Sequence, residues 1–254
     1  MNVKPKKYLG QHFLIDESIS ERISNSISKN KKINLLEIGP GTGALTKFLV
    51  QKDINLKTYE LDQESIKFLN LKYPKLKVYN EDILKVNWKN LFTSNFTVTG
   101  NFPYNISSQI LFKIYDHRDI IDEMVGMFQK EVAERVCSGP GTKKYGILSV
   151  LIQAFFKAEY LFTVNEDVFD PPPKVKSGVI RISRNDVKQL NCNEKLFFRV
   201  VKAIFNQRRK MARNSLKSLL GEQKIDHVLM TKRPEELTVN NFIEITNLLE
   251  SKIN

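Results

Sequence analysis

The tetrapeptide Asn101-Phe102-Pro103-Tyr104 is the segment of this 254-residue chain whose residue types most directly suggest chemistry. The amide oxygen of Asn101 and the main-chain carbonyl of Phe102 are acceptors that can hold the two N–H groups of an exocyclic amine, such as that of adenine. The lone pair of that nitrogen is delocalised into the ring, so such bonds would favour its attack on an electrophilic carbon. Pro103 restricts the turn, and Tyr104 offers a flat face to an unstacked base. A plain turn that closes a strand is the alternative for these residues.

A glycine-rich turn, EIGPGTG (37–43), ends an apolar run and opens a helical pattern. Gly39 and Gly41 allow the backbone to approach a ligand closely. Glu60 follows Gly39 by 21 residues, the spacing at which dinucleotide-binding folds hold ribose hydroxyls with a carboxylate. Asp82 could accept a hydrogen bond from an adenine amino group, or it could cap a local turn. The turn resembles the E-x-G-x-G-x-G form of class I methyltransferases, which indicates S-adenosyl-L-methionine rather than a nicotinamide cofactor.

Short apolar runs alternate with helical patterns over the first 185 residues. Strands are expected at 33–38, 56–59, 76–79, 96–99, 124–128 and 179–182, and helices at 44–49, 63–72 and 106–115. This alternation predicts an α/β fold, a Rossmann-like, doubly wound sheet with helices on both faces. Three further helices are expected at 195–205, 211–220 and 239–251. The sequence therefore predicts a catalytic domain over residues 1–185 and a small all-helical domain over residues 186–254.

The expected sheet also predicts where the chemistry-bearing residues meet. Ligands of open α/β sheets bind outside the carboxyl ends of the strands. Gly39, Glu60 and Asn101 each stand at such an end. We therefore expect the carboxylate of Glu60 and the amide of Asn101 to share one cleft.

The formal net charge of +12 is unevenly distributed along the chain. Residues 171–254 carry 17 basic and 8 acidic side chains, whereas residues 11–170 are balanced. Basic ends on a neutral body indicate a polyanionic partner, although solvated basic helices would give the same counts. The residues expected to contact phosphates are Lys4, Lys6 and Lys7 in the N-terminal arm, and Arg208, Arg209, Lys210, Arg213 and Lys217 near the C-terminus.

Several classes of protein are excluded by composition and spacing. The basic start is followed by no apolar segment of a signal peptide, and no apolar run is long enough to span a membrane. The two cysteines and three histidines are scattered, without the spacing of a disulfide framework or a metal site. A cytoplasmic protein without metal is expected.

Four motifs in order resemble those of the small-subunit (16S) rRNA adenine N6,N6-dimethyltransferase family. They are GQHFLID (10–16), EIGPGTGALT (37–46), NFPYNIS (101–107) and FDPPPKV (169–175). The segments MFQKEVAERV (127–136), RRKMARNSLK (208–217) and RPEELT (233–238) extend the resemblance over nearly the whole chain. It implies S-adenosyl-L-methionine-dependent dimethylation of two adjacent adenines in the 3′-terminal hairpin of 16S rRNA. The expected substrate is the immature 30S subunit, late in its assembly, and the enzyme is expected to be a monomer.

The resemblance also assigns roles to individual residues. Its cofactor contacts fall on His12, Leu14, Gly39, Gly41, Glu60, Asp82 and Asn101. Phe169 matches a second aromatic residue of the family and would cover the base face opposite Tyr104, with a core position as the alternative. Two positions depart from the family pattern. His12 stands where Asn is common, and Phe102 replaces the usual Leu, which is harmless if only its carbonyl acts.

Two other functions are open at this point. A 23S rRNA adenine methyltransferase of the macrolide-resistance type would share the fold and the logic of Asn101–Tyr104. A non-catalytic ribosome assembly factor would keep the fold without turnover. YGILSVLIQAF (145–155) and RRKMARNSLK (208–217) favour the small-subunit group, and a pure binder has no need of Glu60 or Asn101.

Overall fold

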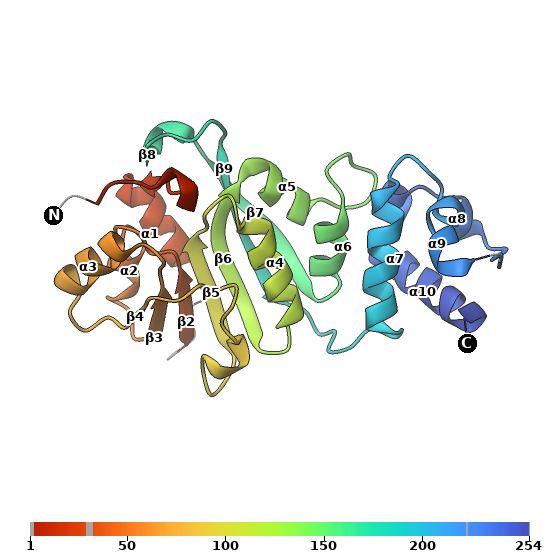
Figure 1. Ribbon diagram of the computed structural model, residues 1–254, viewed down its shortest axis with the longest axis horizontal. Helices are drawn as coiled ribbons and strands as arrows, with labels where there is room; N and C mark the ends of the chain where they lie inside the picture. The colour runs from red at the N-terminus through yellow and green to blue at the C-terminus, as the bar shows by residue number, and fades with distance from the viewer. Residues whose placement is uncertain (1–2, 29–32, 222, 254) are drawn as a thin grey trace. The chain divides into compact units, whose positions relative to one another are not determined.

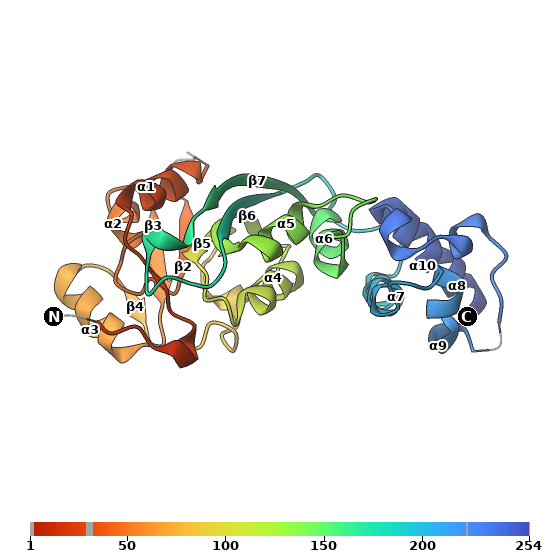
Figure 2. The same ribbon diagram turned by 90° about the horizontal axis from the view of Figure 1, so that it is seen from above.

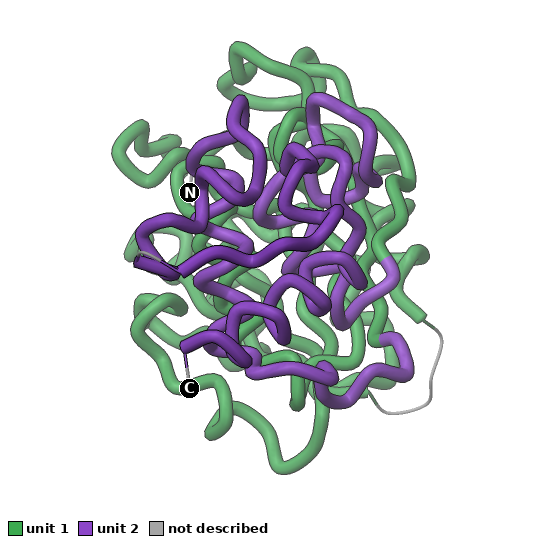
Figure 3. Tube along the Cα trace, turned by 90° about the vertical axis from the view of Figure 1, so that its right-hand side faces the viewer, with its two compact units in different colours: residues 1–134, 158–184 green, residues 135–157, 185–254 purple. Residues whose placement is uncertain are grey.

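The computed structural model describes residues 3–28, 33–221 and 223–253 (Figure 1). These residues form two compact units, coloured separately in Figure 3. The first unit comprises residues 1–134 and 158–184, and the second comprises residues 135–157 and 185–254. The catalytic domain expected over residues 1–185 includes residues 135–157, which here cluster with the C-terminal helices instead of with the sheet. The reason is that α6 (Ile147–Gln153) packs against α7 (Glu194–Asn206) of the same unit.

A seven-stranded sheet forms the centre of the first unit, in the order β4-β3-β2-β5-β6-β9-β7. Its strands are β2 (Asn34–Ile38), β3 (Asn55–Tyr59), β4 (Val78–Tyr79), β5 (Phe96–Asn101), β6 (Ile121–Gln129), β7 (Phe156–Val164) and β9 (Ser177–Arg184). The five strands from β4 to β6 pair in parallel, and β9 joins β6 in antiparallel orientation. A separate two-stranded sheet pairs β1 (Phe13–Leu14) with β8 (Phe169–Asp170).

Helices cover both faces of this sheet, as the alternating pattern predicts. The helices that begin in this unit are α1 (Glu17–Ser26), α2 (Thr46–Leu49), α3 (Gln63–Lys72), α4 (Ser107–Asp116) and α5 (Lys130–Cys137), with short 3-10 turns at Lys7–Leu9, Trp88–Asn90 and Glu166–Val168. Figure 2 shows α1 and α4 on opposite sides of the strands. The class of fold expected from the sequence is therefore present.

The register of the parallel strands places the chemistry-bearing residues level with one another. Ile38 pairs with Tyr59, so Gly39 and Glu60 are the next residues on two neighbouring strands. Glu37 pairs with Thr99 on the other side, so Asn101 is level with Gly39. All three residues thus lie at one edge of the sheet.

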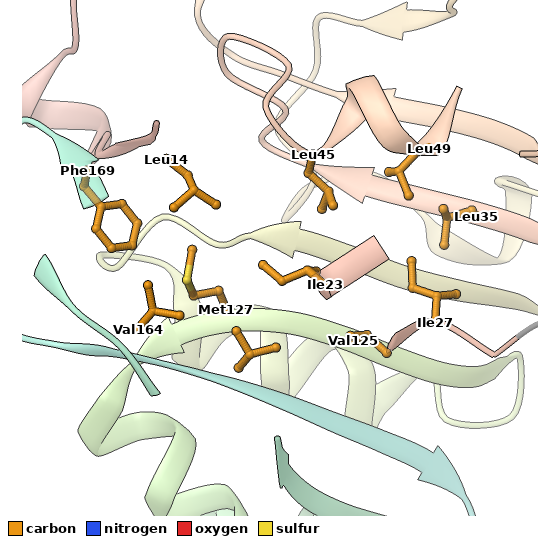
Figure 4. Packing of buried hydrophobic residues seen from close by; sticks show 11 residues of the cluster. Leu14, Ile23, Ile27, Leu35, Leu45, Leu49, Val125, Met127, Val164 and Phe169 are labelled. Carbon is orange, nitrogen blue, oxygen red and sulfur yellow. The ribbon is translucent and has the colours of Figure 1, made fainter. Parts of the chain in front are cut away.

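An apolar cluster holds α1 and α2 against one face of the sheet (Figure 4). Ile23 of α1 and Leu45 and Leu49 at α2 pack on the β6 residues Val125 and Met127 and their neighbours. Because side chains alternate across a strand, Met124 and Phe128 of β6 belong to the opposite face. The two faces of the same strands are therefore both buried, as expected for a parallel sheet between helix layers.

The structure differs from the expected elements at several points. Helix α2 begins only at Thr46, because Gly41 and Gly43 have left-handed backbone angles of 55° and 80° and form a turn. Strand β5 continues to Asn101, so the tetrapeptide begins inside the strand instead of after it. The expected helix 211–220 is divided by a turn at Leu216. The sequence patterns also did not reveal α1, α5, α6, β7 or the small β1–β8 sheet.

The second unit is helical. Its helices are α6, α7, α8 (Ala212–Ser215), α9 (Lys217–Leu220) and α10 (Val239–Ile253), with 3-10 turns at Val228–Thr231 and Pro234–Glu236. Helix α7 buries one continuous face, and its Phe205 stacks on Phe242 of α10 with 5.6 Å between the ring centroids. None of the helices formed by the described residues has the length and apolar character that a membrane crossing requires.

Candidate active site

A cleft opens at the carboxyl ends of β2, β3 and β5. The residues that line it include His12, Leu14, Gly39, Gly41, Glu60, Asp82, Asn101, Phe102, Pro103 and Tyr104. These are the residues that the sequence assigns to cofactor binding and to catalysis, except Phe169. Glu60 and Asn101 thus share one cleft, as expected.

Glu60 is held at the base of the cleft by main-chain donors. Its Oε1 accepts from the N–H groups of Leu61 and Asp62 at 2.8 and 2.9 Å, and its Oε2 accepts from Gly41 at 3.0 Å. Burial raises the pKa of this carboxyl group above its usual value, and the three N–H donors oppose that rise. Each carboxylate oxygen has a second acceptor site, so Oε2 can also receive a hydroxyl proton from a ligand.

Gly41 is required by its backbone angle and by one close approach. Its φ of 55° is left-handed, and a Cβ atom there would lie 3.0 Å from the ring of Phe13. The Gly41 N–H is the group that Glu60 accepts from. A side chain at this position would therefore displace Phe13 of the arm or change the turn.

Glu37 lies below the turn and is 1% exposed. Both of its carboxylate oxygens face the hydroxyl of Thr46, at 2.8 and 3.0 Å. Burial raises the pKa of Glu37 to about 8, the Thr46 hydroxyl opposes this, and the nearby charge of Glu60 adds to it. A protonated Glu37 at neutral pH removes one of two negative charges from the same turn.

Asp82 forms a local turn and also lines the cleft. Its Oδ1 accepts from the N–H of Leu84 at 3.0 Å, and its main-chain carbonyl accepts from Lys85 and Val86, which is the pattern of a turn. Its Oδ2 lies 3.8 Å from the Lys85 ammonium. Because Asp82 also lines the cleft, its turn fixes an acceptor at the wall beside Ile83.

The orientation of the Asn101 amide is fixed by the N-terminal arm. Its Nδ2 donates to the main-chain carbonyl of His12 at 3.0 Å, which identifies Oδ1 as the acceptor end. The His12 ring in turn donates through Nδ1 to the Pro171 carbonyl at 2.7 Å, because a carbonyl can only accept. His12 thus connects the arm to the tetrapeptide and to the proline segment.

Tyr104 is fixed by its hydroxyl group. This group lies 2.5 Å from the Oγ of Ser177 in β9, and the Tyr104 ring lies 5.4 Å from the His12 ring, centroid to centroid. Burial raises the pKa of Tyr104, and the Ser177 hydroxyl opposes the rise. The ring is a neutral, fixed surface at the wall of the cleft.

Comparison with known proteins agrees with this geometry. Residues 2–251 match the family model described as "Ribosomal RNA adenine dimethylase". The ribosomal RNA small subunit methyltransferase A of Bacteroides thetaiotaomicron is 54% identical over 256 aligned positions, which cover 99% of this chain and 96% of the relative.

The chain belongs to the ribosomal RNA adenine dimethylase family.

Two solved structures extend the comparison to the fold. A dimethyladenosine transferase from Plasmodium falciparum has a TM-score of 0.79 and 25% identity over 95% of this chain and 98% of its own. The 23S rRNA methyltransferase ErmE has a TM-score of 0.68 and 25% identity over 92% of this chain and 99% of its own. The adenine dimethyltransferase function, the class I methyltransferase fold and the S-adenosyl-L-methionine cofactor expected from the sequence are thereby confirmed. The 23S alternative is not favoured.

Phe169 is the expected catalytic residue that lies away from the cleft of this dimethylase. Its side chain is 2% exposed and packs in the apolar cluster with Leu14, Met127 and Val164 (Figure 4). Strand pairing explains this position, because β8 places Phe169 opposite Leu14 of β1. The core alternative thus describes its place, and stacking on a base would require the ring to leave this cluster.

The basic residues of the arm divide into two kinds. Lys4 and Lys7 are exposed, as expected for phosphate contacts. Lys6 instead forms an ion pair with Asp62, and its ammonium lies 3.4 Å from Glu64. Burial alone would raise the pKa of Asp62, but Lys6 and the other donors around it lower the value below its usual range. Lys6 therefore fastens the arm to the start of α3.

The basic residues of the second unit divide in the same way. Arg208 donates from its guanidinium to the carbonyls of Tyr145 and Thr142, at 2.8 and 3.1 Å. It therefore holds the loop before α6 in place. The side chains that remain exposed along the same segment are Arg209, Lys210, Arg213 and Lys217. Among the described residues, no group of three or more His, Cys, Asp or Glu side chains is arranged to hold a metal.

Sequence reasoning missed two residues that shape the site, Asp62 and Gln11. Asp62 caps α3 by accepting from Glu64 N and Ser65 Oγ, and it also receives Gln11 Nε2 at 3.4 Å. An Asp directly before a helical pattern is a recognisable cap signal. No local signal could show that the same carboxylate binds residues more than fifty positions away.

The raised pKa of Glu37 gives a pH-dependent stability. Between its unfolded value of 4.5 and its folded value of about 8, the folded protein holds a proton that the unfolded chain releases. The free energy of unfolding should therefore fall as pH rises through this window. Urea unfolding at about pH 5 and about pH 8 should show a loss about 3 kcal/mol larger in the wild type than in Glu37→Gln. Glu21→Gln, at an exposed position of α1, is the control and should follow the wild type. Parallel pH curves for wild type and Glu37→Gln would contradict this assignment.

Proposed function

We propose that this enzyme dimethylates the N6 amines of two adjacent adenines in the 3′-terminal hairpin of 16S rRNA. Its substrate is the immature 30S subunit, on which it acts as a monomer in the cytoplasm without a metal ion. The first unit carries the methyl transfer, and the basic surface of the second unit contributes RNA contacts. The observation that supports this most directly is the fixed amide of Asn101 in the same cleft as Glu60.

The residues of the cleft fit S-adenosyl-L-methionine. Glu60 supplies a fixed carboxylate for ribose hydroxyls, and Asp82 supplies an acceptor for the adenine amine. Gly39 and Gly41 leave the turn open where side chains would fill the space, and Leu14 adds an apolar wall. When bound, the cofactor supplies a methyl group on a positively charged sulfur.

The tetrapeptide supplies the acceptors for the target amine. In the first transfer, Asn101 Oδ1 and the Phe102 carbonyl would each accept one N–H of the adenine N6 group. In the second transfer, the monomethylated amine would donate its remaining N–H to one of them. These bonds favour a nitrogen whose lone pair is directed at the methyl carbon. Tyr104 presents its ring to the extruded base, and water carries the released proton away. No covalent intermediate with the protein is required.

Asn101→Ala tests the role of the amide. Methylation of immature 30S subunits should fall on the order of 10²-fold, because one of two positioning acceptors is lost. Affinity for the 30S subunit should stay within about twofold, since phosphate contacts dominate RNA binding. Single-turnover incorporation of labelled methyl groups measures the first, and filter binding measures the second. Asn90→Ala, at an exposed position outside the cleft, is the matched control.

Unchanged turnover in Asn101→Ala would remove the proposed role of the amide. Methylation by the wild type of protein-free 23S rRNA, but not of immature 30S subunits, would overturn the proposed substrate.

Recognition of RNA should depend on the exposed basic residues and not on Arg208. Shape and phosphate contacts dominate, because an A-form duplex hides its base edges in a deep major groove. Arg209→Ala and Arg213→Ala should each weaken binding and reduce the slope of log affinity against log salt by about 1. Arg208→Ala should lower the melting temperature instead, because two main-chain carbonyls lose their donor. Equal salt slopes for wild type and Arg209→Ala would exclude this phosphate contact.

A further inference from the structure

The side chain of Phe102 is completely enclosed, although the proposed function uses only its carbonyl. The residue is 1% exposed, and its ring lies 4.7 Å from that of Phe128, centroid to centroid, at an angle of 39°. Phe102 lines the cleft, but its ring lies against Phe128 and Gly126, on the face of the sheet opposite the α1 cluster. A ring of this size therefore needs enclosed space beside the reacting centre.

Two glycines on neighbouring strands provide that space. Gly100 of β5 pairs with Gly126 of β6. A Cβ atom at Gly126 would lie only 2.2 Å from Cε2 and 2.9 Å from Cζ of Phe102. A Cβ atom at Gly100 would lie 3.0 Å from Cε1 of the same ring. The ring thus rests directly on the backbone of both strands, in what we term the glycine slot (Gly100 and Gly126).

The main chain on either side of the Phe102 carbonyl is also fixed. The Phe102 N–H donates to the Met127 carbonyl at 3.1 Å. Pro103, which follows, packs on the cofactor turn, because a Cβ atom at Gly39 would lie 3.5 Å from its Cδ. With the ring seated in the glycine slot, the peptide unit that bears the carbonyl is fixed at three points.

We propose that the Phe102 side chain is a positioning residue for methyl transfer, and that Gly126 is the residue that makes this possible. The ring in the glycine slot sets the position of the Phe102 carbonyl, and through it the angle at which the target amine is held. This inference rests on the proposed function, because the carbonyl is the acceptor assigned there. It gives a structural reason for Phe at this position in place of Leu: the larger side chain is matched by a missing one on β6.

The contact between Gly126 and the Phe102 ring predicts that the effects of substitutions at these two positions on kcat are coupled. The Phe102 atoms that Gly126→Ala would strike are Cε2 and Cζ, and leucine has neither. In the wild type, Gly126→Ala must therefore push the ring and its carbonyl aside. In a Phe102→Leu background the same methyl group no longer meets these two ring atoms, and its remaining close neighbour is the Gly100 carbonyl oxygen at 3.0 Å. Displacements of about 1 Å at a reacting centre reduce rates on the order of 10²-fold.

The experiment is a double-mutant cycle on Gly126→Ala and Phe102→Leu, with kcat and KM for immature 30S subunits and the Kd of S-adenosyl-L-methionine measured for each variant. Gly126→Ala should lower kcat on the order of 10²-fold with cofactor Kd and KM within about threefold. Phe102→Leu alone should lower kcat about tenfold, because the slot is no longer filled. Adding Gly126→Ala to Phe102→Leu should change kcat less than threefold, which is the expected coupling. Gly139→Ala is the matched control, since a Cβ atom there meets nothing within 4 Å.

The possible outcomes separate the two proposals. A folded Gly126→Ala variant with wild-type kcat overturns the positioning role and leaves the proposed function standing. So does a double variant that recovers the melting temperature but not kcat, because the coupling is then one of stability alone. If Gly126→Ala does not fold, Phe102→Leu decides, and its wild-type kcat would overturn the role. An inactive wild type on immature 30S subunits would instead refute the proposed function, and the positioning role with it.

Discussion

The site depends on the parallel register of three strands. Because β2 pairs in register with both β3 and β5, the residues that follow Ile38 and Tyr59 and the last residue of β5 are level with one another. The glycine turn at Gly39, the Glu60 carboxylate and the Asn101 amide, which are far apart in the sequence, therefore lie close together at one edge of the sheet. The Gly41 N–H donates to Glu60 across this edge, and burial of that carboxylate is tolerated because main-chain donors surround it. A shift of one residue in either pairing would turn these side chains to the other face of the sheet.

The N-terminal arm completes the site from outside the sheet. One end is fastened by the ion pair of Lys6 with Asp62, and the other end pairs as β1 with β8. Between these points the His12 carbonyl accepts from Asn101, so the arm determines which end of that amide can accept from a ligand. We therefore infer that the arm takes part both in cofactor binding and in the orientation of the target amine. A basic segment that composition alone would assign to RNA binding has a structural task as well.

The sequence predicts those features that depend on local pattern. The extent of α3 agrees with the expected helix at 63–72, since Asp62 caps it and its apolar spacing is regular. The turn at Gly39 follows from the positions of the glycines, whereas the strand expected at 96–99 continues to Asn101. The sequence does not predict long-range partners. In the sequence, Phe169 stands directly before Asp170 and three prolines, and nothing local shows that it is buried. Pairing of β8 with β1 buries it in the apolar cluster. In the sequence, Arg208 does not differ from the basic residues around it. Its structural role appears only when the carbonyls of Thr142 and Tyr145 lie within hydrogen-bond distance of its guanidinium. No local signal shows the role of Gly126, because this role depends on its contact with the ring of Phe102, which follows the neighbouring strand β5.

We expect Glu60 and the glycine turn to hold the cofactor in the cleft where Asn101 ends β5. Titration calorimetry of S-adenosyl-L-methionine on wild type and Glu60→Gln tests it most directly, with native emission of the buried Trp88 as the sign that the variant is folded. The Kd should be roughly 10- to 100-fold higher in Glu60→Gln, because hydrogen bonds to a charged group contribute about this much binding free energy. An unchanged Kd in a folded Glu60→Gln variant would contradict it, because the cofactor would then be bound elsewhere.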